Sequence, residues 1–112
     1  MATYSSNLDI SNIEDYRQTF ELASASDNAA LNLTGYTVSS QMRKYAGSAT
    51  ATDFTATIVS PETAGKVSIA LTSGDTSSLK EGRYVYDVVI EKDSVKTKVV
   101  EGMVLVRQGV TR

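Results

Sequence analysis

Two segments of this chain, residues 65–71 and 82–90, place an apolar side chain at every second position. Successive side chains of a strand point to opposite faces of the sheet, whereas a helix would distribute the same residues around its axis. Both segments are therefore predicted to be strands with one buried face. The residues expected on these faces are Val67, Ile69 and Leu71 in the first segment, and Tyr84, Tyr86, Val88 and Ile90 in the second.

The same period of two recurs in residues 16–22, 36–44, 53–60 and 98–106, and in the short stretch 8–10. Ser11 and Glu14 are also spaced as a helical capping box, but Thr19 and Phe20 favour a strand over 16–22. About seven strands separated by turn-rich stretches are typical of a two-sheet sandwich. The predicted core is Phe20, Leu22, Val38, Met42, Phe54, Ile58, Val67, Ile69, Leu71, Leu79, Tyr84, Tyr86, Val88 and Ile90.

The spacing Gly82-x-Tyr84-x-Tyr86 is typical of an immunoglobulin-like sandwich, in which a corner tyrosine precedes a core cysteine by two residues. Tyr84 is expected to donate its hydroxyl to a backbone group in the preceding turn, and Tyr86 to fill the volume of that cysteine. A turn of helix before residue 82 would place Leu79 at the end of the core. We therefore predict an all-β fold, an immunoglobulin-like antiparallel β-sandwich of about seven strands over residues 14–112, with an extended N-terminal arm or short strand over 1–13.

The last predicted strand is apolar on both faces, with Val100, Val104 and Val106 on one side and Val99, Met103 and Leu105 on the other. A solvated face should be polar, so something is expected to cover the second face. Two alternatives remain open: the N-terminal segment around Leu8 and Ile10 pairs alongside the last strand and covers this face within the chain, or a partner subunit covers it. The interface candidates are Leu8, Ile10, Val85, Val89, Val99, Met103 and Leu105.

The composition excludes several functional classes. The 112 residues suit one domain, and the net charge of −2 with scattered Lys and Arg argues against nucleic-acid binding. The chain has no Cys and no His, and we expect no cofactor, no metal site and no catalytic residues. No apolar run is long enough for a membrane span, and the first residues lack the features of a secretory signal.

Two short motifs have simpler structural explanations. Ser77 and Lys80 have the S-x-x-K spacing of acyl-transfer enzymes, but they occupy a polar turn without companion motifs. Asn32-Leu33-Thr34 is a glycosylation acceptor sequence, and Leu33 is more simply explained as a core residue before the turn at Gly35. The sequence therefore predicts a protein that is not an enzyme.

Taken together, the segments QTFEL, LNLTGYTVSSQMRK, GKVSIALTS, LKEGRYVYDVVI and VVEGMVLVRQGVTR resemble a family of small virion structural proteins of tailed bacteriophages, especially T4-like phages of marine cyanobacteria. The resemblance covers nearly all of residues 16–112. Related immunoglobulin-like modules begin phage baseplate and receptor-binding proteins. The family has no catalytic motif, so the resemblance assigns no functional residues.

The resemblance implies a non-enzymatic virion component, assembled in the bacterial cytoplasm, that docks to other virion proteins and to copies of itself. It would serve the tail, baseplate or neck and dock through apolar strand faces and terminal arms, with Arg107 and Arg112 in the C-terminal arm. One alternative is a capsid decoration protein. The other is a carbohydrate-binding host-attachment module, which would need exposed aromatic residues; Tyr36 and Tyr45 are the candidates.

Overall fold

A computed structural model describes residues 4–23 and 30–109 of the chain. Strands dominate these residues, as the alternating pattern predicted. In chain order the elements are β1 (Tyr4–Ser5), β2 (Leu8–Ser11), β3 (Tyr16–Glu21), β4 (Thr37–Arg43), β5 (Thr52–Asp53), β6 (Thr55–Ile58), a 3₁₀ turn η1 (Glu62–Ala64), β7 (Lys66–Leu71), α1 (Ser73–Ser77), β8 (Gly82–Lys92) and β9 (Val95–Arg107).

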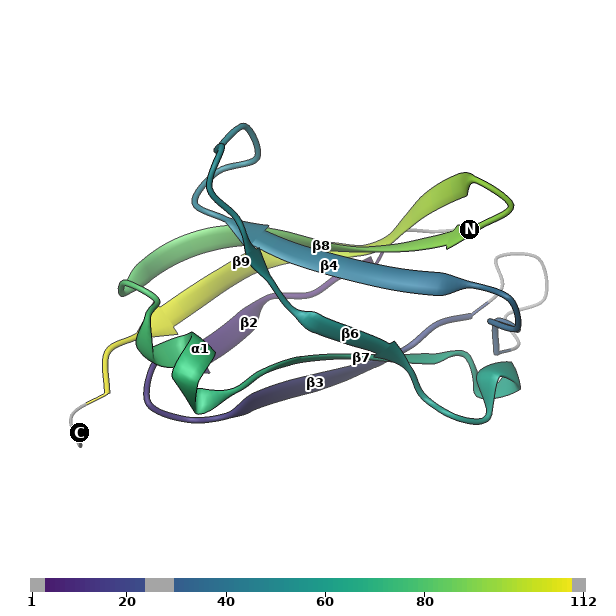
Figure 1. Cartoon of the computed structure of the whole chain (residues 1–112), viewed down its shortest axis with the longest axis horizontal. Helices are drawn as coiled ribbons and strands as arrows, with labels where there is room; N and C mark the ends of the chain where they lie inside the picture. The colour runs from purple at the N-terminus through teal and green to yellow at the C-terminus, as the bar shows by residue number, and fades with distance from the viewer. Residues whose placement is uncertain (1–3, 24–29, 110–112) are drawn as a thin grey trace.

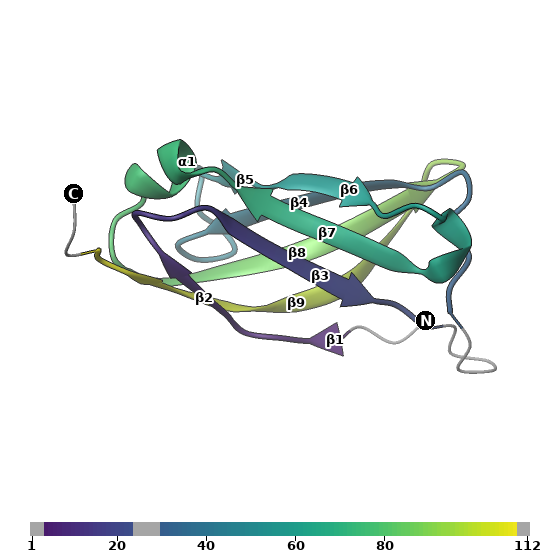
Figure 2. The same cartoon turned by 90° about the horizontal axis from the view of Figure 1, so that it is seen from below.

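The strands form two layers (Figure 1). The larger sheet has the order β1-β9-β8-β4-β5, with β2 also paired to β9, and the smaller has the order β3-β7-β6. This is the strand order of an immunoglobulin-like sandwich, so the predicted fold class is confirmed. In Figure 2, α1 lies at one end of the two layers, and β1 and β2 lie along β9.

The described residues form nine strands where about seven were predicted, because two of the predicted segments are divided. Residues 53–60 were expected to form one strand, but the chain changes sheets at Phe54: β5 pairs with β4, and β6 pairs with β7. The N-terminal segment is divided into β1 and β2, and both run parallel to β9. These two pairings are the exception to the predicted antiparallel arrangement, since all other pairs are antiparallel.

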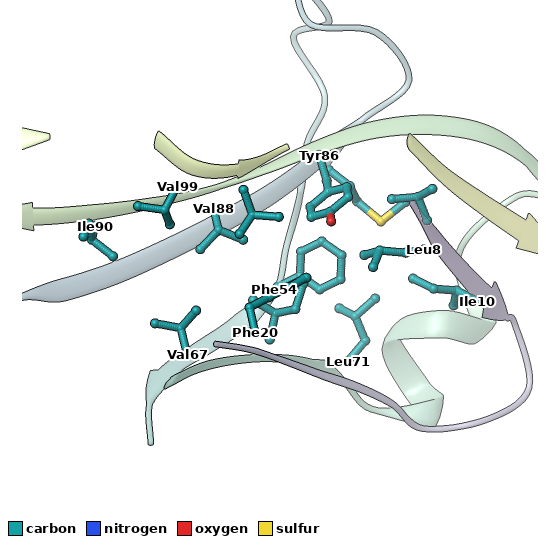
Figure 3. Packing of buried hydrophobic residues seen from close by; sticks show 14 of the residues in the cluster. Leu8, Ile10, Phe20, Phe54, Val67, Leu71, Tyr86, Val88, Ile90 and Val99 are labelled. Atoms are coloured by element: carbon teal, nitrogen blue, oxygen red, sulfur yellow. The ribbon is translucent and has the colours of Figure 1, made fainter. Parts of the chain in front are cut away.

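The core lies between the sheets (Figure 3) and contains the predicted residues. Of these, Val38, Ile58 and Tyr84 are only partly buried and pack against the others. The ring edge of Phe54 meets the ring of Tyr86, with centroids 6.3 Å apart and planes at 69°, a favourable aromatic geometry. Leu33, also expected in the core, is buried. Further buried hydrophobic residues are Leu8, Ile10, Val99, Val100, Val104 and Val106.

The tyrosine corner forms as predicted. The Tyr84 hydroxyl donates a hydrogen bond of 2.8 Å to the Lys80 carbonyl in the preceding turn. The predicted helical turn is α1, which begins with a capping box between Thr72 and Asp75, and buried Leu79 follows it. The capping-box alternative for residues 11–22 is not adopted; these residues form the end of β2, a turn and β3.

Gly102 allows the N-terminal segment to lie directly against β9. A Cβ atom at Gly102 would stand 2.0 Å from the Ser6 carbonyl oxygen, far inside any real contact distance. Ser6 lies at the break between β1 and β2, where its amide donates to the Glu101 carbonyl at 3.0 Å. Beside it, the Asn7 side-chain oxygen accepts from the Met103 amide at 3.1 Å. The strand can therefore carry only glycine here without moving its neighbour.

Gly102→Ala is expected to lower the free energy of unfolding by about 1–3 kcal/mol, because backbone must shift to admit the new methyl group. Urea unfolding of the purified protein measures the loss. Gly74→Ala is the matched control: its Cβ would meet only the Thr72 hydroxyl oxygen at 3.7 Å, an ordinary contact. It should not lower stability, and because Gly74 lies in α1 it should raise the free energy of unfolding by about 0.4–1 kcal/mol. Equal stability of the two variants would contradict the close approach at Gly102.

Candidate docking face on strands β8 and β9

Four of the predicted interface residues gather on the outer face of the larger sheet, away from the core. Val85 and Val89 are half-buried on β8, and Met103 and Leu105 on β9 are 49% and 38% exposed. Val85 lies directly opposite Met103 across the two strands. We call Val85, Val89, Met103 and Leu105 the outer apolar face.

Leu8 and Ile10 were wrongly predicted to be available to a partner. They are 4% and 0% exposed, because β2 pairs with β9 in the same chain and turns both side chains into the core. Only the alternate residue Asp9 points outward, where its carboxylate receives the Arg107 side chain at 2.9 Å. β1 and β2 therefore extend the sheet at its edge, and within the described residues 4–11 the chain does not cover the outer apolar face.

Val99 was also wrongly placed on the outer face. A strict alternation puts it on the side of Met103, but the register of β8 and β9 shifts between Val88 and Val89. Val88 pairs with Val100 and Val89 pairs with Lys98, which leaves Val99 as the extra residue of a β-bulge. Val99 is 0% exposed and adds to the core.

The bulge predicts that Val99→Ala costs about 2 kcal/mol of stability, the sum of two lost methyl groups and the cavity left behind. Val95→Ala, at an exposed residue of the same strand, should cost less than about 0.5 kcal/mol. Thermal and urea unfolding of both variants test this. A negligible effect of Val99→Ala would contradict the burial of Val99 in the core.

Charged residues surround the outer apolar face. Arg107 pairs with Asp9, and the Lys98 ammonium lies 2.9 Å from a Glu101 carboxylate oxygen. These partners raise the pKa of both Arg107 and Lys98 through hydrogen bonding and opposite charge. Both cations stay charged at neutral pH, so the apolar residues have a polar rim, as protein interfaces do.

Burial raises the pKa of two tyrosines, and one of them, Tyr86, also bonds to the N-terminal segment. The Tyr86 hydroxyl donates to the Ser6 carbonyl at 2.6 Å, and burial raises the Tyr86 pKa. Burial is the main reason that the Tyr16 pKa is raised to about 12, and repulsion from the nearby groups Tyr86 and Asp9 adds to the shift. Both hydroxyls therefore remain protonated well above neutral pH.

Stability should consequently fall as the pH rises from about 10 towards about 12. The folded pKa of Tyr16 lies above its ordinary value of 10.0, so the unfolded chain releases this proton first, and the stabilisation present below pH 10 is lost on the way to 12. Urea unfolding at a series of alkaline pH values measures the loss. Tyr16→Phe should make the decline shallower, whereas Tyr45→Phe, at an exposed tyrosine, should leave it unchanged. The same decline in all three proteins would contradict the assignment.

The residues considered for other activities do not converge on a site. Tyr36 and Tyr45 flank opposite ends of β4, whose seven residues span roughly 20 Å. The Tyr36 ring is covered by Lys92, whose ammonium lies 5.5 Å from the ring centroid. The Ser77 hydroxyl donates to the Ser73 carbonyl within α1, and Lys80 is exposed.

Within residues 4–23 and 30–109, no group of three or more Asp and Glu side chains could hold a metal ion. No helix among the described residues is long and apolar enough to cross a membrane. Arg112 of the C-terminal arm lies outside the described residues, whereas Arg107 is already paired within the chain.

Sequence reasoning offered pairing of the N-terminal segment with the last strand as one alternative, and β2 does pair with β9. It missed the particular contacts at Ser6 and Gly102 that hold the segment there. One signal was present: a glycine in the interior of a strand rich in β-branched residues often marks a close approach of another backbone segment. Gly102 stands at such a position. Nothing in the sequence connected it to Ser6, because the two are 96 positions apart.

No protein-family model and no curated protein matches this sequence. Among solved structures, the crystal structure of Listeria monocytogenes InlP aligns with 94% of this chain at 12% sequence identity and a TM-score of 0.48. The aligned region is 28% of the InlP chain. A likeness of this strength supports no conclusion about function.

Proposed function

We propose that this protein is a non-enzymatic structural component of a phage virion, an assembly module of the tail, baseplate or neck. It docks to its neighbours through the outer apolar face. It works mechanically, as a rigid sandwich that carries a fixed contact surface.

The observation that carries this proposal is the exposure of Met103 and Leu105 side by side on β9, next to Val85 and Val89 on β8. The other apolar residues of both strands are in the core, apart from exposed Val95. Burial of apolar area is worth about 25 cal/mol per Å², so an adjoining protein would gain from covering these side chains. Apolar centres with charged rims are typical of stable protein interfaces.

The sequence resemblance to phage structural proteins is the reason for placing this module in a virion. It spans nearly all of residues 16–112 and includes both β8 and β9, the strands that hold the outer apolar face. Localisation in the virion, after assembly in the host cytoplasm, follows from that resemblance and forms part of the same proposal.

The double variant Val89→Asp/Met103→Asp tests the proposal. Both residues face outward, so the isolated domain should remain folded, with its far-UV circular dichroism unchanged and its Tm within a few degrees of wild type. A charge buried without a partner at an interface is costly, so the amount of the variant in purified particles should fall by about tenfold or more. Quantitative mass spectrometry of the particles measures incorporation.

Val95→Asp is the matched control, because it adds one charge at an exposed position of β9 beside the turn to β8. It should be incorporated as well as wild type. Normal incorporation of the folded double variant would refute the outer apolar face as a docking surface.

A further inference from the structure

We infer that this domain carries tension along the direction of β9, and that residues 4–12 together with β9 form the clamp that resists it. This inference goes beyond the docking role proposed above and does not depend on it. Its basis is the direction in which the two segments run and the contacts that join them.

The two segments of the clamp run parallel and side by side. Tyr4 lies opposite Val100, and Ser11 lies opposite Arg107. The chain therefore enters this pair at one end, before Tyr4, and leaves it at the other end, after Arg107. Residues 4–11 span roughly 23 Å at the rise of a parallel strand.

Tension between these two ends acts on the clamp in shear. Force applied before Tyr4 pulls residues 4–12 in one direction, and force applied after Arg107 pulls β9 in the opposite direction along the same axis. The hydrogen bonds between the two segments then share the force, so many must break together. A sideways force on Tyr4 would instead break them one after another, starting at that end.

Hydrogen bonds outside the regular strand pairs extend the clamp at both ends. The Ser6 amide donates to the Glu101 carbonyl at 3.0 Å, in the break between β1 and β2. Beyond the end of β2, the Asn12 amide donates to the Arg107 carbonyl at 3.0 Å. The Gly109 amide donates in turn to the Asn12 side-chain oxygen at 2.6 Å.

Side chains join the two segments between these ends. The Met103 amide donates to the Asn7 side-chain oxygen at 3.1 Å. The Arg107 side chain donates to both carboxylate oxygens of Asp9, at 2.9 and 3.0 Å. Both contacts link residues that would move past each other under shear, so each must break before the segments can slide.

The core also resists sliding of residues 4–12. The Tyr86 hydroxyl donates to the Ser6 carbonyl at 2.6 Å from the core side. Leu8 and Ile10 are buried, so a slip along β9 would have to pull both side chains out of the core. On its other edge β9 pairs with the whole of β8, which is eleven residues long. The N-terminal segment is therefore the part of the clamp expected to yield first.

Single-molecule pulling at constant force tests the inference. The chain has no cysteine, so an added one gives a defined attachment point. One protein is held by its two chain ends. The second keeps the N-terminal handle and carries the other on Ser39→Cys, an exposed residue of β4 that lies across β8 and β9 from the start of the clamp and so pulls Tyr4 sideways.

At the same force, the folded state should last about a hundredfold longer or more when the protein is held by its ends, because forced unfolding is governed by the unfolding rate and shear breaks many bonds at once. Matching circular dichroism spectra and urea unfolding of the two proteins serve as the control for the added cysteine. Equal lifetimes in the two pulling directions would overturn the clamp.

Tyr86→Phe, held by the chain ends, tests whether the force acts on this pair of segments. Loss of one shared hydrogen bond should raise the unfolding rate at constant force by about two- to tenfold. Tyr45→Phe, at an exposed tyrosine outside the clamp, is the matched control and should leave the rate unchanged. An unchanged rate in Tyr86→Phe would overturn residues 4–12 and β9 as the resisting pair. Failure of the docking role would appear separately, as normal incorporation of Val89→Asp/Met103→Asp into particles.

Discussion

The pairing of β9 is the interaction on which the rest of this sandwich depends. Its thirteen residues bond to β8 along one edge and to β1 and β2 along the other, so neither edge is open over most of its length. Its inward residues Val100, Val104 and Val106 complete the core. With both edges and the inner face occupied, the outer face is the part of β9 left to meet another molecule, and its exposed Met103 and Leu105 are apolar.

The N-terminal segment decides which surfaces remain available. Gly102 admits Ser6 against β9, and the Tyr86 hydroxyl holds the Ser6 carbonyl from the core side. Leu8 and Ile10 are buried in the chain's own core, so these two residues are not available to a neighbour. β1 and β2 cover one edge of β9, so we propose that a neighbour meets β9 through the outer apolar face and not by pairing with its edge.

The sequence predicted the features that depend on local pattern. The period of two gave the strands and most of the core, and the spacing of Tyr84 from the preceding turn gave the tyrosine corner. It could not predict features set by long-range register. The bulge at Val99 reverses the parity of β9 relative to β8, and only pairing with β8 reveals it. The change of sheets at Phe54 and the attachment of Ser6 beside Gly102 likewise depend on segments distant in the sequence. For the docking face, the sequence identified Val85, Val89, Met103 and Leu105 but also included three residues that the fold buries.

Oxidation of Met103 measures most directly whether the outer apolar face is covered in the assembled state. Hydrogen peroxide converts an accessible methionine to its sulfoxide, and peptide mass spectrometry gives the rate at each site. Met42 is fully buried in the core and serves as the internal standard. Met103 should react much faster than Met42 in the isolated, dilute protein and should be strongly protected in intact particles. Equal reactivity of Met103 in both states would contradict a docking role for this face.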